Sequence, residues 1–300
     1  MNKIVKAITN PSYALQLILH LLSPLIKDDE KYVKIKYRLA MGKKLDLENP
    51  QTYNEKLQWL KLHDQRSEYS TMVDKYDAKK YVADIIGEEY IIPTLGIYNS
   101  FEEIDFEQLP QQFVLKCTHN SGGIVICKDK DHLNKAKANR FLTKYLHKNP
   151  YWSNREYPYK NVKPRIIAEK FMVDESGTEL KDYKFFCFDG KCKIMFIATE
   201  RPKNTKFDFY DTQFNHLPFT NGHPCSSKEL KKPENFEEMI SIAEKLSQGI
   251  PHVRVDLYNI NGKIYFGELT FFHWSGKVPF DPEEWDYKIG EWLHLPINKK

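Results

Sequence analysis

The sequence lacks the cysteine patterns of disulfide-rich and zinc-binding domains. It has only 5 cysteines in 300 residues, an odd number, and no Cys-x-x-Cys pair. Most of them lie in apolar, strand-like runs, where free thiols are typically buried. This usage predicts reduced cysteines and a cytoplasmic location.

Long hydrophobic runs are also missing. The most apolar stretch, LQLILHLLSPLI at residues 15–26, is too short to span a bilayer and is interrupted by His20 and Pro24. No small-residue cleavage site follows it. We expect a helix packed on the body of the protein. The alternative is a peripheral contact with the inner face of the membrane, to which Lys3 and Lys6 would contribute.

Charge of one sign is not concentrated anywhere. The chain carries 45 Lys and Arg against 41 Asp and Glu, and its net charge is +4. Because the lysines are spread along the chain, there is no basic tail and no nucleic-acid partner is expected. Small acidic or phosphorylated substrates are compatible with this balance.

Familiar nucleotide and nucleophile motifs are absent too. The sequence has no G-x-G-x-x-G, no Walker ending GK[ST], and no persuasive Cys–His or Ser–His arrangement. KFDFYD places Asp208 and Asp211 at the wrong spacing for a metal-binding D-x-D motif. These absences argue against dinucleotide-binding, P-loop and nucleophilic enzymes.

What the chain does contain is a succession of segments that predicts an α+β protein. Apolar spacing predicts helices up to about residue 90, and β-rich runs follow at 88–98, 113–127 and 165–200. One amphipathic helix, FEEMISIAEKLSQG, precedes a β-hairpin, and the tail beyond it is aromatic and broken by prolines. Because strands follow strands, we expect antiparallel sheets rather than a doubly wound fold.

The hairpin, VRVDLYNINGKIYFGELT at residues 253–270, carries charges among β-branched residues and turns at Asn261-Gly262. A two-residue loop would put Glu268 on the face opposite Asp256. A three-residue loop with Gly262 in the left-handed conformation puts Arg254 across from Glu268 and Asp256 diagonal to it. We prefer this second register. The apolar face would then hold Tyr265, Gly267 and Leu269.

These two carboxylates beside an arginine allow two interpretations. The structural one is an ordinary Arg254–Glu268 cross-strand ion pair. The functional one is a Mg²⁺ site, because neighbouring carboxylates require a proton or a cation between them, and Mg²⁺ binds such oxygens together with phosphate. The functional interpretation predicts phosphate-binding residues elsewhere in the chain.

Cationic and glycine-bearing segments of that kind are present. FVLKC places Lys116 in a buried strand, and the loop Asn120-Ser121-Gly122-Gly123 that follows lets backbone amides approach anionic oxygens. Two later strands carry unexpected charges. These are Glu169 and Lys170 in RIIAEKFM, and Asp182 and Lys184 in DYKFFCF.

The order of these parts resembles the ATP-grasp ligases over roughly residues 50–280. YNEKLQWLKL, GEEYIIPTLGIY, FVLKC, DYKFFCFDGK, RVDLY and FGELT are similar to the TupA-like branch, found in bacterial surface-polysaccharide (teichuronopeptide) gene clusters. The resemblance implies two α+β lobes that grip ATP. It divides the chain into a helical segment 1–50, a preceding lobe 51–110, a small lobe with the glycine loop 111–172 and a large lobe with the Mg²⁺-binding hairpin 173–300.

The resemblance also assigns site roles. The phosphate-binding lysines would be Lys75 and Lys116, under a loop formed by Asn120, Ser121, Gly122 and Gly123. The adenine-binding hinge would be Glu169, Lys170, Phe171 and Met172, with Asp174 or Glu175 at the ribose. The catalytic cations would be Arg254 and Lys184. The Mg²⁺ ligands would be Asp256, Glu268 and Thr270, the last replacing the Asn that the family often has there.

The implied function is an ATP- and Mg²⁺-dependent carboxylate–amine ligase that proceeds through an acyl-phosphate. The resemblance suggests a uronic acid joined to an amino acid or amino sugar, with a small-molecule or lipid-linked saccharide as substrate. The alternative is a glycosyltransferase that uses a nucleotide sugar, a label that proteins of this branch often carry. The sequence names neither the carboxylate nor the amine, and it leaves the oligomeric state open.

Overall fold

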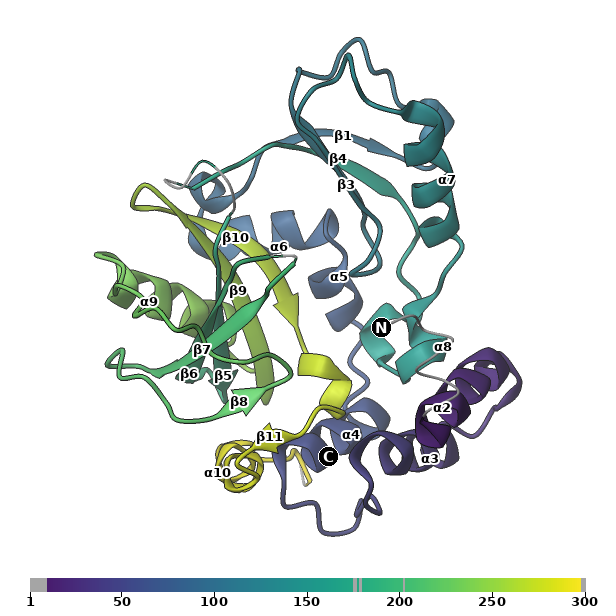
Figure 1. The fold of residues 1–300 in the computed structure, drawn as a ribbon, viewed down its shortest axis with the longest axis vertical. Helices are drawn as coiled ribbons and strands as arrows, with labels where there is room; N and C mark the ends of the chain where they lie inside the picture. Colours follow the sequence, from purple (N-terminus) through teal and green to yellow (C-terminus); the bar gives the residue numbers. More distant parts are fainter. Residues whose placement is uncertain (1–9, 175–176, 178–179, 202, 298–300) are drawn as a thin grey trace.

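Two antiparallel sheets organise the protein. The computed structural model describes residues 10–174, 177, 180–201 and 203–297. The first sheet has the strand order β1-β4-β2-β3 and the second has the order β10-β9-β5-β6-β7. Figure 1 shows the first sheet at the top of the view and the second at the lower left, with α5 and α6 in the middle. The expected α+β architecture with antiparallel sheets is confirmed.

The first sheet packs one face against a helix. Its strands are β1 (Thr94–Tyr98), β2 (Phe113–Cys117), β3 (Ile124–Cys127) and β4 (Ile166–Lys170), and the helix is α7 (Lys135–Leu146). Leu115 and Ala168 of the sheet share a buried core with Leu142 of α7. The strand expected at 88–98 begins only after Pro93, which has no N–H for a sheet ladder but accepts a hydrogen bond from the Lys170 amide at 3.0 Å.

The second sheet packs on helix α9 (Phe236–Leu246). Its strands are β5 (Asp182–Phe188), β6 (Lys191–Thr199), β7 (Lys206–Asp211), β9 (His252–Ile260) and β10 (Lys263–Thr270). Met239 and Leu246 of α9 are fully buried in one core with Val253 and Val255 of β9. The edge strand β7, formed by KFDFYD, was not expected from the sequence.

The remaining elements lie around and between these two units. They are α2 (Pro11–Leu22), α3 (Asp29–Met41), α4 (Tyr53–His63), α5 (Tyr69–Val73), α6 (Asp77–Ile86), α8 (Pro150–Asn154), β8 (Thr220–Asn221), β11 (Phe280–Asp281) and α10 (Glu284–Trp292). The helical N-terminal segment is therefore present. The aromatic, proline-broken tail contains α10, which is anchored to α4 because the Asn54 side-chain amide donates to Asp286 at 2.9 Å. Among the described residues, no helix is long and apolar enough to cross a bilayer.

The C-terminal hairpin has a shorter turn than expected. Lys263 pairs with Ile260, so the turn consists of Asn261 and Gly262. Both have positive φ, 52° and 80°, as in the two-residue type I′ turn whose twist matches that of the strands. The expected three-residue loop is wrong.

A β-bulge at Gly267 restores the arrangement of charges that the longer loop was expected to supply. The register shifts between Phe266 and Glu268, and Glu268 then pairs directly with Asp256. A Cβ at Gly267 would lie 2.9 Å from the Asp256 carbonyl oxygen, so the bulge requires glycine. Because the bulge accommodates Gly267 without a partner, the two carboxylates share a face.

The apolar face of β10 differs accordingly from the one expected. Ile264 and Phe266 are buried before the bulge, and Leu269 is buried after it. Tyr265 and Gly267, which were expected on that face, are only partly buried. The buried face of β10 is therefore formed by even-numbered residues before the bulge and by odd-numbered residues after it.

Candidate functional site

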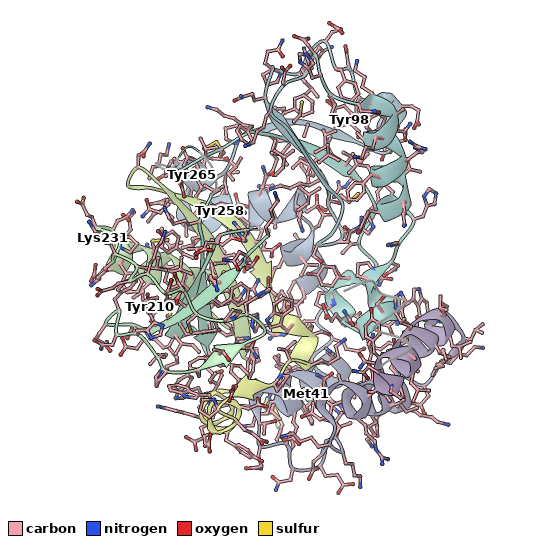
Figure 2. All side chains as sticks on the ribbon, viewed as in Figure 1. Met41, Tyr98, Tyr210, Lys231, Tyr258 and Tyr265 are labelled. Carbon is pink, nitrogen blue, oxygen red and sulfur yellow. The ribbon has the colours of Figure 1, made fainter. Side chains whose placement is uncertain are left out.

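A cleft of about 350 Å³ is lined by both sheets. Tyr258, labelled in Figure 2 on the hairpin, belongs to its wall. The charged side chains around it come from segments far apart in the chain. They are Lys75, Lys116 and Glu169 on the side of the first sheet, and Asp182, Lys184, Arg201, Asp256 and Glu268 on the side of the second.

Arg254 and Asp256 form a buried bidentate ion pair at the base of this site. Arg254 donates from Nε and a terminal nitrogen to the two oxygens of Asp256, at 2.7 and 2.8 Å. Arg254 lies opposite Thr270 in the hairpin, not opposite Glu268 as expected, and donates to its hydroxyl at 3.1 Å. The two oxygens of Glu268 are more distant, the nearer one 3.7 Å from Arg254.

Lys184 adds a second cation to Asp256. It occupies the position of β5 paired with Asp256 of β9 and donates to the same carboxylate. Burial raises the pKa of Asp256, although both cations act in the opposite direction. Lys184 also lies 3.3 Å from Asp182, whose carboxylate accepts from Arg201 as well.

Glu268 is the carboxylate that opens to the cleft. Its side chain is 37% exposed. Burial opposes its charge, but Lys75, Lys184 and Arg254 around it lower its pKa to about 2. Glu268 is therefore ionised at neutral pH, and its nearest cation atom is Lys75 Nζ at 3.5 Å.

Glu169 is held between two lysines. Lys116 approaches one of its oxygens at 2.7 Å, and Lys79 pairs with the other. Glu169 is only 5% exposed; burial opposes ionisation, but the two lysines hold its pKa below the ordinary value. Lys79 was missed in the sequence, although it lies only four residues after Lys75; Lys75 is in the turn before α6 and Lys79 in the first turn of that helix.

The glycine loop is ordered by its own asparagine. The side-chain oxygen of Asn120 accepts from the amides of Gly122 and Gly123 at 3.1 and 3.0 Å, so both amides expected to face phosphate are engaged. Lys75 donates to the Asn120 carbonyl at 3.0 Å. Ser121 is exposed and lines the cleft.

The predicted hinge is only partly assembled at the cleft. Of its four residues, Glu169 alone lines it, whereas Lys170 is exposed at the end of β4. Phe171 and Met172, which follow Lys170 in the chain, are half-buried. Asp174 is buried and accepts from the backbone and side chain of Lys181. The alternative ribose residue, Glu175, lies outside the described residues.

His273 contacts Arg254 behind the site, and Asn221 contacts His273; the sequence suggested a structural or substrate-side role for His273 rather than that of a catalytic base, and did not single out Asn221. The second terminal nitrogen of Arg254 donates to His273 Nδ1 at 2.6 Å, and the other ring nitrogen lies 2.9 Å from the side-chain oxygen of Asn221. Burial, with Arg254 adjacent, lowers the pKa of His273 well below its ordinary value. The neutral ring therefore accepts from Arg254 and donates to Asn221, which fixes its tautomer.

The donor set fits a divalent cation at Glu268. Its carboxylate is ionised and open to the cleft, and the Thr270 hydroxyl lies 3.4 Å away. Asp256 offers oxygens of the right kind, but they are engaged by Arg254 and Lys184. A cation would use Asp256 only after Lys184 has moved, whereas Glu268 needs no such change.

Comparison with known proteins identifies the family. A sequence profile described as TupA-like ATPgrasp matches residues 55–294, and no curated protein matches. Similar solved structures include D-alanine–D-alanine ligase from Bacillus anthracis with ATP, at 16% identity and a TM-score of 0.38, covering 67% of this chain and 54% of that one. The Helicobacter pylori ligase matches at 16% identity and 0.42, covering 80% and 69%.

An N5-carboxyaminoimidazole ribonucleotide synthetase in complex with ADP is similar at 16% identity and a TM-score of 0.42, covering 81% of this chain and 56% of that one. The chain thus spans only about half to two thirds of the length of these structures. The family profile, in contrast, extends over most of the chain. The protein belongs to the TupA-like ATP-grasp family.

Proposed function

We propose that the protein is an ATP- and Mg²⁺-dependent carboxylate–amine ligase that proceeds through an acyl-phosphate. The observation that supports this most is the convergence of cations from both sheets on one cleft. Lys75 and Lys116 line it on one side and Lys184 and Arg201 on the other, and Arg254 pairs with the cleft residue Asp256. Phosphoryl transfer depends mainly on positioning and on neutralising charge, for which such a set is suited.

In this proposal each residue has a specific task. Lys75 and Lys116 bind the phosphates, and Glu169 holds Lys116 in place. Glu268 and Asp256 hold Mg²⁺, which neutralises charge on the transferring phosphoryl group. Arg254, fixed by Asp256 and His273, faces the reacting carboxylate, and its charge is permanent.

The substrate class rests on the TupA-like resemblance. We infer a uronic acid as carboxylate donor and an amino acid or amino sugar as amine, in surface-polysaccharide biosynthesis. A lipid-linked saccharide is compatible with α2, which exposes apolar side chains. These are Leu15, Ile18, Leu21 and Leu22, with Leu25 just beyond the helix. The glycosyltransferase alternative gains no support, because Asp208 and Asp211, the carboxylates considered for its metal-binding motif, do not line the cleft.

The decisive experiment is product analysis. Purified protein is incubated with ATP, Mg²⁺, uronic acids and amines, and nucleotide products are separated by chromatography. The proposal expects ADP and phosphate in equal amounts, dependent on both substrates. Stoichiometric pyrophosphate, or release of a nucleoside diphosphate from a nucleotide sugar instead, would contradict it.

A nucleotide screen provides a test without known substrates. ATP with Mg²⁺ at about a hundred times its dissociation constant should stabilise the fold by about 2.7 kcal/mol. UDP-sugars should leave the melting temperature unchanged. The opposite pattern would favour glycosyl transfer.

A further inference from the structure

A second cluster of ligand-type side chains lies on the edge strand of the second sheet, outside the cleft. One carboxylate oxygen of Asp208, one ring nitrogen of His216 and the sulfur of Cys225 all lie within 4.8 Å of one another. They come from β7, from the turn that follows it and from the segment after β8. Tyr210 of the same strand is labelled at the left of Figure 2, away from Tyr98 in the first sheet.

The local backbone explains how three distant positions meet. Tyr210 and His216 form an antiparallel bridge that folds the chain back on β7. The Phe207 amide donates to the Pro224 carbonyl at 3.1 Å, which brings the next residue, Cys225, alongside the strand. The Ser226 amide then donates to one oxygen of Asp208 at 2.9 Å.

The other oxygen of Asp208 is the feature that points to a ligand. Asp208 is 2% exposed, and its Oδ2 has no hydrogen-bond partner in the described structure. His216 Nε2 lies 3.6 Å from Oδ1, too far for a good hydrogen bond. Buried carboxylate oxygens are rarely left without a partner, because the desolvation cost is then uncompensated.

We propose that Asp208, His216 and Cys225 form a Zn²⁺ site with one protein oxygen, nitrogen and sulfur ligand each. Such mixed sets suit Zn²⁺, which binds three protein ligands tetrahedrally and leaves a fourth position for water. A cavity of about 390 Å³ borders Asp208 and His216 and leaves room for that water. On binding, the Cys225 thiol loses its proton to solvent and the sulfur coordinates as thiolate.

The site would connect the edge strand to the segment that carries part of the cleft wall. Phe207, next to Asp208, and His223, two residues before Cys225, both line the cleft, and their rings are 4.6 Å apart. A metal that ties Asp208 to Cys225 would hold these two rings in register. The proposal itself does not depend on the ligase function.

The test measures metal content of the full-length protein. Protein stripped with a chelator is equilibrated with Zn²⁺, desalted and analysed by mass spectrometry of the metal, and Co²⁺ replaces Zn²⁺ in a parallel sample. We expect one zinc per chain and a thiolate-to-cobalt charge-transfer band. Cys225→Ser and His216→Gln should each weaken Zn²⁺ affinity by about tenfold or more, and Cys225→Ser should abolish the band.

Matched controls separate this site from adventitious binding. Cys127→Ser removes a thiol in the first sheet, and His132→Gln removes a histidine whose ring lies 2.7 Å from Asp129 on the surface. Both should retain wild-type zinc. His216 is 47% exposed, so its variant keeps the test valid if Cys225→Ser folds poorly. No bound zinc in the wild type, or equal zinc in His216→Gln and the controls, would overturn the proposal.

Discussion

Lys184 occupies the position beside Asp256 that the proposed function gives to a metal ion. The two residues are paired across β5 and β9, and the ammonium group contacts the carboxylate directly. Asp256 is thus neutralised without a metal. The apo protein should therefore bind Mg²⁺ weakly, and the arrival of ATP phosphates, which attract Lys184, should make Asp256 accessible.

Replacing Lys184 tests this competition. Lys184→Met removes the ammonium group but keeps an apolar stem of similar length. Mg²⁺ affinity without nucleotide should rise, because Asp256 and Glu268 lose a competing cation, whereas ATP turnover should fall by about a hundredfold. Isothermal titration with Mg²⁺ and an ADP-release assay measure the two effects. Lys191→Met, which removes an exposed lysine paired with Glu244, is the control, and unchanged Mg²⁺ affinity in Lys184→Met would refute the competition.

Glu268→Gln distinguishes a metal ligand from a structural ion pair. The substitution keeps shape but removes the anion, so turnover should fall by about a hundredfold or more. Stability should decrease slightly at low salt, because Lys75, Lys184 and Arg254 lose a counter-charge, and added salt should reduce the difference. Melting curves and turnover are compared with Glu237→Gln, a surface carboxylate that pairs with Lys232. A Glu268→Gln enzyme with full activity would remove Glu268 from the metal site.

The two lysines around Glu169 should act together. Lys79→Met or Lys116→Met alone leaves Glu169 one partner, whereas the double variant leaves a buried carboxylate uncompensated, a situation that typically costs about 3–5 kcal/mol. The double variant should therefore lose more stability than the two single variants combined. Urea unfolding of the wild type, the two single variants and the double variant measures the coupling energy between the two lysines. In a Glu169→Gln background the effects of the two substitutions on the free energy of unfolding should be additive. Additive effects in the wild-type background would show that the lysines act independently.

Two buried histidines should make the protein acid-sensitive. Burial lowers the pKa of His252 to about 3 and that of His273 well below 6.5. Each then binds a proton on unfolding but not when folded. Stability is therefore lost as pH falls through about 6.5, with a slope that for His252 approaches about 1.4 kcal/mol per pH unit toward pH 5, and His273 adds to the loss in the same direction. Urea unfolding between pH 7 and 5 should show this decline, and a constant free energy of unfolding across that interval would contradict it.

The exposed face of α2 predicts weak binding to membranes. Leu21 and Leu25 are 76% and 77% exposed, and Lys27 follows them in the sequence. Sedimentation with anionic phospholipid vesicles should deplete the protein from solution, and a Leu21→Ser, Leu25→Ser variant should stay soluble. Ile126→Ser alters an apolar side chain in the first sheet that is 58% exposed and should bind like the wild type. Equal depletion of all three proteins would rule out this contact.

The sequence could name several residues that the structure brings to one cleft, because their charges stand out locally and their order is distinctive. Asp256, Glu268, Lys116 and Glu169 could be named from charges inside apolar strands. Their partners could not be named, because a lysine on a helix surface such as Lys79 resembles any solvated lysine until the tertiary packing places it beside a carboxylate. Ionic pairing across sheets depends on the full fold.

The hairpin shows the same limit at the level of the backbone. Asn261-Gly262 indicated the turn correctly, but the alternation of side chains alone could not show that a glycine within the strand adds a residue. Gly267 was the available signal, since glycine inside a strand often marks a bulge. The expected three-residue loop also placed Asp256 and Glu268 on one face of the hairpin, but it placed Glu268 instead of Thr270 opposite Arg254.

The bulge also constrains how this protein family can vary in length. Between Asp256 and Glu268 the chain contains the two-residue turn, which reverses its direction, and Gly267, the extra residue of the bulge. Deleting Gly267 would remove the unpaired residue and leave Glu268 opposite Asp256 with Leu269 still in the core, whereas deleting a paired residue of β10 while the bulge remains would exchange their faces. We therefore expect homologous sequences to tolerate a single-residue gap at Gly267 itself, and to have glycine there wherever the extra residue is kept.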